Sequence, residues 1–554
     1  MTDMTDTTGF SLRGLLADTT PVIWLITAAW TLLLCLWSVL PPIFSAPDEP
    51  QHIDTIIDTV GRSPLMWVTP DGDRMSNAIL EAQDRFGYRT RDPQNPDLFL
   101  DDRRLGGRAA EEAFPRDERP SVATLSAADR LPSSRLNQMY QHPPLYYRTA
   151  AWVIGAIPGW ERVGLDVLVG IMRLLSVVVV APLPVVMAGL ARVLDGRRSL
   201  ELSAALSPLL VPQLAHLGSV TSNDGLLFVL TAFLVLLLAR VYRGDISRAT
   251  ATWVGAILLA AMLTKGFALF MPVAVVAAYG GAVRVSGVEP RAAMTRLLRS
   301  AAIAGLSLWW YGENLLRFGG VQPSVAAPPA ADEHGSVLGW LGRAWITQTQ
   351  TFWGRFGWAE TGFGEVTTTT LSIVAIVLVL IAVRKREGTL LTVLLLPGVL
   401  AIVTTIGQSW TSWDTIGTIR AVHGRYFFVS LAGLLLLMVM GLHRLVDRWP
   451  PLARWTWTPV FVAGVWLHAS SWLTAVEYFW TTPDAPSLSD GGRALLAWQP
   501  WPPLLVQITA VALALLGIEL LRRLVVLSRA DGTTSAHPSE EQHEPEDEED
   551  HVPA

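Results

Sequence analysis

Two adjacent carboxylates, Asp48 and Glu49, follow the first long apolar run of the sequence, in the segment FSAPDEPQH. A carboxylate at the edge of a low-dielectric region can have its pKa raised and can act as a general base. His52, three residues beyond Glu49, shares its face of a helix. The alternative is that one of the carboxylates only caps a helix. The pair is therefore the first candidate for catalysis, and a divalent cation nearby stays open, since two carboxylates can serve one.

His142 is a second candidate, in the segment NQMYQHPPLYY. Two prolines follow it and stiffen the backbone before Tyr146 and Tyr147. A lone histidine is more often structural than catalytic. The interest of His142 therefore depends on its lying on the same side of the protein as Asp48.

The segment TSND at 221–224 supplies two more polar side chains, Asn223 and Asp224. Both residue types are favoured at helix N-termini, so helix capping is one expectation. The other is that they hydrogen-bond a substrate hydroxyl. The sequence leaves both interpretations open.

The composition indicates that a membrane body positions these residues. Hydrophobic residues make up 51% of the chain and charged residues only 16%, whereas soluble domains carry about 25% charge. The single cysteine, Cys35, excludes an intrachain disulfide framework. We find no phosphate-binding loop in a strand-to-helix context and no zinc-ligand spacing, which disfavours a nucleotide-hydrolysing domain. We expect a cytoplasmic N-terminus at 1–21, one transmembrane domain over 22–530 and a disordered acidic tail at 531–554.

Membrane spans need about 20 apolar residues each, and the hydropathy pattern predicts about twelve of them in an all-α polytopic bundle. The predicted spans are 22–42, 166–190, 203–217, 225–241, 251–264, 266–283, 299–316, 369–384, 389–407, 426–442, 456–478 and 503–524.

Clusters of Arg and Lys fall on every second connection between these spans, from Arg192/Arg197/Arg198 to Arg522/Arg523/Arg529. Positive charge is retained on the cytoplasmic side of a membrane. This pattern predicts that both termini are cytoplasmic. The predicted outer connections are 43–165, 218–224, the turn at Lys265, 317–368, 408–425 and 479–502.

The first outer connection is long and is expected to carry two interfacial helices. After Pro50, apolar residues recur at helical spacing, with Asp54 and Asp58 on the opposite face. A second apolar stretch at 145–157 is too short to span comfortably. Between the two, the stretch 70–135 is rich in Asp, Arg, Pro and Gly and predicts a surface subdomain or mobile loop. The connection at 317–368 is expected to be a second large loop.

Lys265 and Arg425 are basic residues on the predicted outer side, against the charge bias that explains the other basic residues. Either could merely flank a span with its charge at the interface. The functional alternative is an anion site, most plausibly for a phosphate, which Lys meets as a point charge and Arg with a bidentate fork. Arg173, near the outer end of the second predicted span, could join them.

These segments together resemble a family, the integral-membrane glycosyltransferases of the GT-C class. The resemblance is especially to the bacterial domain-of-unknown-function 2142 branch and to its protein O-mannosyltransferase relatives. It covers most of 22–445. It rests on seven short motifs in the expected order: PDEPQH at 47–52, QHPPLYY at 141–147, MRLLS at 172–176, SND at 222–224, TKG at 264–266, ENLLRFG at 313–319 and HGRYFF at 423–428.

The resemblance implies a GT-C-like helical bundle in a bacterial plasma membrane. It also implies an inverting transfer of a sugar from a polyprenyl-phosphate donor to a glycan, lipid or protein acceptor outside the cell. In such families a carboxylate of the Asp-Glu motif accepts the proton of the acceptor hydroxyl, and basic groups stabilise the departing phosphate. Carried over, Asp48 is the expected base, with Glu49 assisting or binding the acceptor. The expected phosphate ligands are Lys265, Arg425, Arg173 and His142, and the expected sugar or acceptor ligands are His52, Asn223, Asp224, Tyr146, His423, Tyr426 and Asn314.

One position departs from the family pattern, because Glu313 precedes Asn314 where family members often have Arg-Asn. Two other functions compete with glycosyl transfer. A flippase or transporter for a lipid-linked glycan would be expected to show an internal repeat and a polar path through the membrane, and we find neither clearly. A non-catalytic scaffold of envelope synthesis would not need the Asp-Glu pair. The sugar, the acceptor and the polyprenyl length are not encoded in any motif that we recognise.

Overall fold

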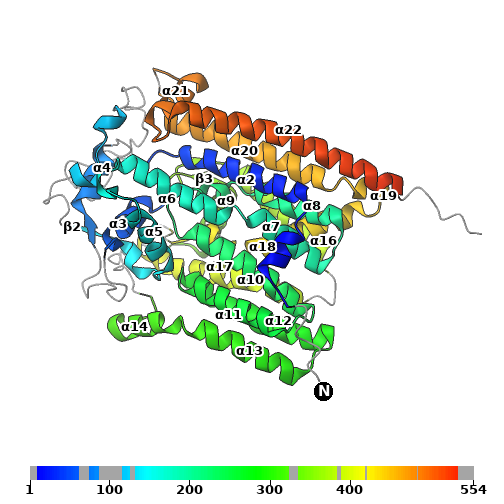
Figure 1. Cartoon of the computed structure of the whole chain (residues 1–554). Helices are drawn as coiled ribbons and strands as arrows, with labels where there is room; N and C mark the ends of the chain where they lie inside the picture. The colour runs from blue at the N-terminus through cyan, green and yellow to red at the C-terminus, as the bar shows by residue number, and fades with distance from the viewer. Residues whose placement is uncertain are drawn as a thin grey trace, which may run out of the picture.

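The computed structural model describes residues 9–61, 74–85, 115–124, 132–322, 335–383, 388–417, 419, 421–482 and 484–534. Helices dominate them, and most run roughly side by side in one bundle (Figure 1). The chain begins with α1 (Leu12–Ala17) and α2 (Pro21–Val39). The other helices of the first half are α3 (Glu49–Thr59), α4 (Asn77–Arg85), α5 (Leu145–Gly155), α6 (Leu165–Val180), α7 (Leu183–Leu194), α8 (Arg198–Leu206), α9 (Pro212–Leu217), α10 (Asp224–Tyr242), α11 (Arg248–Met262) and α12 (Met271–Ser286).

The second half continues the bundle. Its helices are α13 (Pro290–Gly305), α14 (Leu308–Phe318), α15 (Val337–Trp353), α16 (Glu365–Ala382), α17 (Gly388–Ile416), α18 (Leu431–Val446), α19 (Pro450–Ala453), α20 (Trp457–Trp480), α21 (Leu488–Trp498) and α22 (Pro503–Thr534). Short 3-10 helices include η4 (Gln138–Gln141), η6 (Ser207–Leu210), η7 (Gly266–Phe270) and η8 (Gly424–Ser430). Two small antiparallel sheets pair β1 (Arg74–Ser76) with β2 (Pro132–Leu136) and β3 (Arg355–Phe356) with β4 (Thr361–Gly362).

All twelve predicted spans coincide with helical residues, but within the described ranges nine helices are long and apolar enough to cross a membrane. The other three predicted spans are short or interrupted. The stretch 203–217 is divided among α8, η6 and α9, with Pro208 and Pro212 at the starts of the second and third pieces. The stretch 299–316 is divided between α13 and α14, and α11 has only 15 residues. The chain is thus an all-α polytopic membrane protein, and a count of twelve spans is not confirmed.

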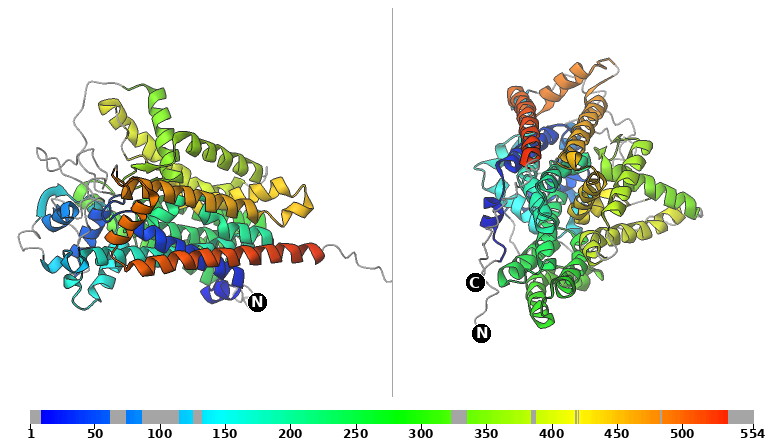
Figure 2. Two further views of the ribbon diagram at one scale, coloured as in Figure 1. Left: turned by 90° about the horizontal axis from the view of Figure 1, so that it is seen from above. Right: turned by 90° about the vertical axis from the view of Figure 1, so that its right-hand side faces the viewer.

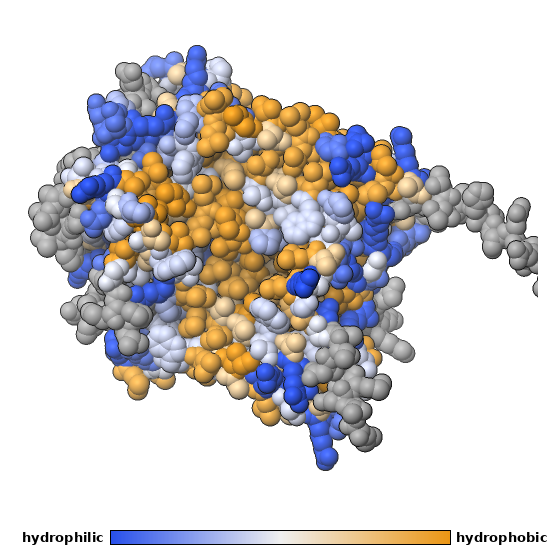
Figure 3. Space-filling model, in the orientation of Figure 1, coloured by the Kyte–Doolittle hydropathy of each residue, from blue (hydrophilic) through white to orange (hydrophobic). Residues whose placement is uncertain are grey.

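The interior of the bundle is built around α10, which is apolar on every side. Its most apolar stretch is 78% buried, whereas that of α22 is 11% buried. A helix that is hydrophobic all round belongs in a core or in lipid. In Figure 2, α22 runs along the outside of the bundle, and Figure 3 shows hydrophobic side chains across the middle of one face with hydrophilic ones toward both ends. This distribution is that of a protein embedded in a bilayer.

The first long connection contributes a separate apolar cluster at the end of the bundle where α3, α4 and α5 gather (Figure 1). Both predicted helices are present, as α3 and α5. Ile53 and Ile56 are fully buried as expected, but Asp54 is buried as well. Its carboxylate accepts hydrogen bonds from Ser76 and Asn137, so the predicted polar face of α3 is covered at Asp54, whereas Asp58 on that face is exposed as expected. Much of the predicted surface subdomain at 70–135 lies outside the described residues.

The described residues of the predicted second loop at 317–368 include regular secondary structure. It contains α15, with 17 residues, and the hairpin of β3 and β4. The apolar residues of α15 pack against α16 and η8. The tail predicted at 531–554 begins later than expected, because α22 continues to Thr534, and the rest of that tail lies outside the described residues.

Candidate functional site

Asp48 lies at the N-cap of α3 in the left-handed conformation, with φ 58°, and its side chain makes no capping hydrogen bond. Helix capping therefore does not account for it. Instead Oδ1 accepts a hydrogen bond from Nε2 of Gln138 at 2.9 Å, and Oδ2 lies 3.5 Å from Nη2 of Arg425. Its side chain is 21% exposed. The carboxylate is thus held from two sides and still reaches solvent.

Arg425 and Lys265 extend this contact into a row of alternating charges, Asp48–Arg425–Asp224–Lys265, which we call the charged row. Nη1 of Arg425 lies 3.5 Å from Oδ2 of Asp224, and Nζ of Lys265 lies 2.5 Å from Oδ1 of the same carboxylate. The side chains of Lys265 and Asp224 are 7% and 3% exposed. Burial lowers the pKa of Lys265, and the charge of Asp224 opposes this shift. Four residues from four distant parts of the chain therefore meet at one end of the bundle.

The local structure explains how the row is assembled. Asp224 is the first residue of α10, and Asn223 before it makes no capping hydrogen bond with its side chain. Lys265 lies in the turn between α11 and η7, and Arg425 is the second residue of η8. Each of these residues therefore lies at or next to the start of a helical segment. Their side chains meet at the end of the bundle where Asp48 lies.

Arg425 is buried but poorly paired. It is 9% exposed, and its Nε has no hydrogen-bond partner among the described residues. Its two ion-pair contacts, at 3.5 Å each, are long compared with the 2.7–2.9 Å of a charge-assisted hydrogen bond. A buried donor without a good acceptor is costly. The guanidinium also interacts with the side chain of Tyr426, but its two carboxylate contacts are long, so an anion that displaced one of them could bind it at shorter range.

Arg173 is the opposite case. Its guanidinium donates to both oxygens of Glu49 at 2.8 and 2.7 Å and to the carbonyls of Ser38, Pro41 and Pro42. All five of its N–H groups are thus used. We predicted that Arg173 binds a donor phosphate, but the structure leaves it no donor to offer, so its role is structural.

Glu49 is likewise occupied and is not exposed to solvent. Besides Arg173, its carboxylate accepts hydrogen bonds from the backbone N–H groups of Phe44 and Thr221. It was expected to assist catalysis or to bind the acceptor. In the structure it instead ties the end of α2, the start of α3 and the turn before α10 together.

The predicted histidine ligands lie beside the charged row but are not cations. Burial lowers the pKa of His52 to about 3, and Lys265 and Arg425 act in the same direction. Burial and the same positive charges also lower the pKa of His142 well below its usual value. The hydroxyl of Tyr147 lies 2.9 Å from Nδ1 of His52. His142 thus lies near the cations of the row, where its expected contact with a phosphate stays a prediction.

Aromatic side chains lie next to the row. The ring of Tyr426 stacks on Phe267 with centroids 4.3 Å apart, and His423 meets Tyr426 edge-on. Burial lowers the pKa of His423 to about 3. Tyr146 is buried against Tyr147, and burial raises its pKa. The half-buried pair Tyr426 and Phe267 offers a flat apolar surface of the kind on which a sugar ring can stack.

Of the remaining predicted ligands, Asn223 lies near the charged row and Asn314 does not. Asn223 is fully buried near the row, where its Nδ2 donates to the carbonyl of Thr264 and its Oδ1 has no partner among the described residues. Asn314 is on α14 and donates to the carbonyl of Val321, and no described contact joins it to the row. Glu313, at the position that departs from the family pattern, pairs with Arg317 on its own helix.

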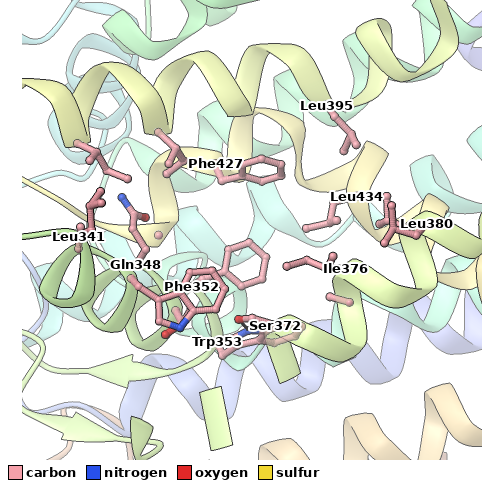
Figure 4. Close-up of a pocket in the computed structure, with 18 residues that line it drawn as sticks. Leu341, Gln348, Phe352, Trp353, Ser372, Ile376, Leu380, Leu395, Phe427 and Leu434 are labelled. Atoms are coloured by element: carbon pink, nitrogen blue, oxygen red, sulfur yellow. Dashed lines mark hydrogen bonds between the residues drawn. The ribbon is translucent and has the colours of Figure 1, made fainter. Parts of the chain in front are cut away.

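An apolar cavity of about 510 Å³ lies within the bundle (Figure 4), and Gly424, the residue before Arg425, is one of those that line it. In Figure 4, Leu341 and Gln348 lie toward one end, and Leu380 and Leu395 toward the other. Neither amide atom of Gln348 has a hydrogen-bond partner among the described residues. The walls come from α15, α16, α17, η8 and α18. The charged row and a long apolar space thus adjoin, as an amphiphile with an anionic head group requires.

The two carboxylates of the Asp-Glu motif do not converge. Glu49 accepts from Arg173 while Asp48 turns toward Arg425. Within the described residues no three His, Cys, Asp or Glu side chains are grouped so that they could hold a metal ion. The charged groups that contact Asp48 and Asp224 are Arg425 and Lys265, and cations next to the carboxylates disfavour a divalent cation there.

Three residues of this region were not singled out in the sequence. Gln138 lies inside the segment NQMYQHPPLYY, and Phe267 directly follows the motif TKG. Gln348 lies in the connection at 317–368. The signal for Gln138 was available, because a polar side chain near a candidate base can orient it. Nothing in the sequence pointed to Gln348, since its cavity requires α15 to fold against η8.

Fold and surface together define a polytopic membrane protein of the α-helical class, with a buried charged site at one end of its bundle. A family model of predicted membrane proteins, DUF2142, matches residues 31–434. The chain belongs to this family. The match includes all four members of the charged row and ends within α18. No curated protein matches the chain.

Proposed function

We propose that this protein is an inverting glycosyltransferase that moves a sugar from a polyprenyl-phosphate donor to a cell-envelope glycan, lipid or protein. The observation that carries the proposal is Arg425, a buried guanidinium that is poorly paired and lies 3.5 Å from the partly exposed carboxylate of Asp48. A cation that can bind a leaving phosphate and a carboxylate that can take a proton lie side by side. That is the combination which glycosyl transfer from a lipid phosphate needs.

In the proposed reaction Asp48 accepts the proton of the acceptor hydroxyl. The hydroxyl oxygen attacks the anomeric carbon, and the bond from that carbon to the phosphate oxygen breaks, with its electron pair passing to the phosphate. Arg425 and Lys265 stabilise the charge that develops on the phosphate. His142 adds a hydrogen bond to the phosphate, and the ring pair Tyr426 and Phe267 lines the sugar.

The apolar cavity supports a lipid donor rather than a soluble one. It adjoins Arg425 through Gly424, and the segments that wall it include three of the nine membrane-length helices. The alternating clusters of Arg and Lys support an orientation with both termini cytoplasmic and the charged row at the outer face of the plasma membrane. The last turns of α22 lie at the opposite end of the bundle from α3 and α5, which agrees with this orientation (Figure 1).

The test is a comparison of envelope glycans, by mass spectrometry, among the host strain, a deletion strain and the deletion strain complemented with Asp48→Asn. We expect the deletion to remove a glycan of defined mass difference and Asp48→Asn to fail to restore it at normal protein abundance. Asp484→Asn, which changes an exposed carboxylate between α20 and α21, is the matched control and should restore it. Full restoration by Asp48→Asn would reject the base, and a deletion without a glycan change would favour a scaffold role.

A further inference from the structure

The charged row is balanced without a ligand. Asp48 and Asp224 carry two negative charges, and Arg425 and Lys265 carry two positive ones. An anion that enters this row must therefore compete with a carboxylate for the cations. The two carboxylates of the row differ in how easily an anion can displace them.

Asp224 is the tightly held carboxylate. It is 3% exposed as a side chain, and Lys265 grips it at 2.5 Å while Arg425 lies on its other side. Asp48 is the loosely held one. It is 21% exposed, and its contact with Arg425 is 3.5 Å long. An incoming anion would therefore displace Asp48 and leave Asp224 in place.

Asp48 accepts a second hydrogen bond that this displacement would leave intact. Its Oδ1 accepts from Nε2 of Gln138 at 2.9 Å, whereas the oxygen that faces Arg425 is Oδ2. Loss of the Arg425 contact would leave the carboxylate attached through Oδ1 and would turn Oδ2 toward solvent. A carboxylate that is no longer paired with a guanidinium is a stronger base.

We infer that Asp48 and the lipid phosphate bind Arg425 in competition, and that the phosphate frees Asp48 to act as base. Without donor, Asp48 masks the cation that the donor needs. With donor bound, Asp48 is released toward the side from which an acceptor hydroxyl can approach. The donor then binds before the acceptor. Asp48 becomes available as a base only when a sugar donor is bound. The inference rests on the proposed function and specifies the order of its steps.

Proton and charge balance support this order. During transfer the acceptor hydroxyl loses its proton to Oδ2 of Asp48, while the phosphate gains one negative charge as the bond to the sugar breaks. The total charge of the site is unchanged, because the charge lost by Asp48 appears on the phosphate, and this added charge lies on the group that faces Arg425. Product release is then favoured when Asp48 gives up its proton to water and regains Arg425.

The test measures phosphate binding by the full-length protein in lipid nanodiscs, using farnesyl phosphate and inorganic phosphate as probes. We expect Asp48→Asn to bind farnesyl phosphate about tenfold more tightly than the unchanged protein, a difference that corresponds to one modest charge interaction. Asp484→Asn serves as the neutral control. If Asp48→Asn raises the affinity for farnesyl phosphate and for inorganic phosphate by the same factor, both probes bind at the charged row. If farnesyl phosphate also binds far more tightly than inorganic phosphate, the ligand is the lipid phosphate.

Unchanged or weaker farnesyl phosphate binding by Asp48→Asn overturns the competition, as does tighter binding of inorganic phosphate alone. Asp48→Ser, checked by size-exclusion chromatography, repeats the measurement if the Asn variant fails to fold. The result is separable from the proposed function. Lost sugar transfer with unchanged affinity would reject only the competition, and tighter binding with intact transfer would reject only the role of Asp48 as base.

Discussion

Arg173 and Glu49 form a bidentate ion pair at 2.8 and 2.7 Å, with the side chains 3% and 0% exposed. The pair joins α6 to the first residue of α3 and, through backbone groups at 38–45 and 221, to the turn before α10. Asp48 and Asp224 are the immediate neighbours of these segments. The pair therefore determines where the catalytic candidates lie without itself facing a substrate.

Removal of this pair should destabilise the protein. We expect Glu49→Ala to lower stability by about 3–5 kcal/mol, because a guanidinium is left buried without its partner. The measurement is thermal unfolding in detergent, followed by the loss of monodisperse protein on size-exclusion chromatography. Glu365→Ala, at the exposed start of α16, is the control. A Glu49→Ala protein with normal stability and no sugar transfer would instead return Glu49 to the catalytic residues.

Arg425 should not tolerate lysine. Lysine keeps the charge but loses the planar fork that can face Asp48, Asp224 and a phosphate together. We expect Arg425→Lys to reduce the transfer rate by about 100-fold, the order found for loss of one donor to a developing charge. The rate is measured with purified protein, once the deletion strain has identified the donor. Arg493→Lys, on the exposed α21, should have no effect. A rate within a few-fold of normal would show that only the charge matters.

The pH dependence of stability should report on Asp54. Burial raises the pKa of Asp54 from 3.8 to about 7, although hydrogen bonds from Ser76 and Asn137 oppose this shift. A carboxyl whose pKa is raised by folding binds its proton more tightly in the folded state. Its contribution to stability is therefore most favourable below pH about 4, declines as the pH rises to about 7 and is constant above that.

The asparagine of Asp54→Asn cannot ionise. The melting temperature of this variant minus that of the unchanged protein should therefore increase as the pH rises from 4 to 7. Thermal unfolding across that range checks the prediction. Asp18→Asn, an exposed change at the C-cap of α1, should give a flat difference. A flat difference for Asp54→Asn as well would mean that the carboxylate is already ionised at pH 4.

The apolar cavity should select for the length of the donor lipid. Ala344 lines it and is 2% exposed, so Ala344→Phe would occupy space that a lipid chain needs. We expect the transfer rate to fall at least about tenfold with a long polyprenyl donor and to change less with a short one, because the long chain needs more of the volume of the cavity. Ala29→Phe, in a second apolar cavity of about 430 Å³ between α2, α20 and α22, is the matched control. Equal losses with both donors would point to a folding defect instead.

Much of the architecture follows from local patterns. Runs of apolar residues predicted helices at every predicted span, and the spacing of Ile53 and Ile56 predicted the buried face of α3. Helix length was harder to predict, because prolines divide 203–217 and a break at 306–307 separates α13 from α14. The burial of Asp54 was not predictable, since its partners Ser76 and Asn137 are distant in the sequence.

The sequence by itself determined the membrane class, the helices and the polar motifs that contain Asp48, Asp224, Lys265 and Arg425, because hydropathy and residue type are local properties. Only the tertiary structure decided what each charge does. Glu49 and Asp48 are neighbours in sequence, but one is closed off by Arg173 and the other faces Arg425. Arg173 and Arg425 look equally suited to a phosphate as residues, yet one has all of its donors satisfied and the other does not. The reason is that pairing and burial depend on which distant segments pack together, and that packing is a property of the whole bundle.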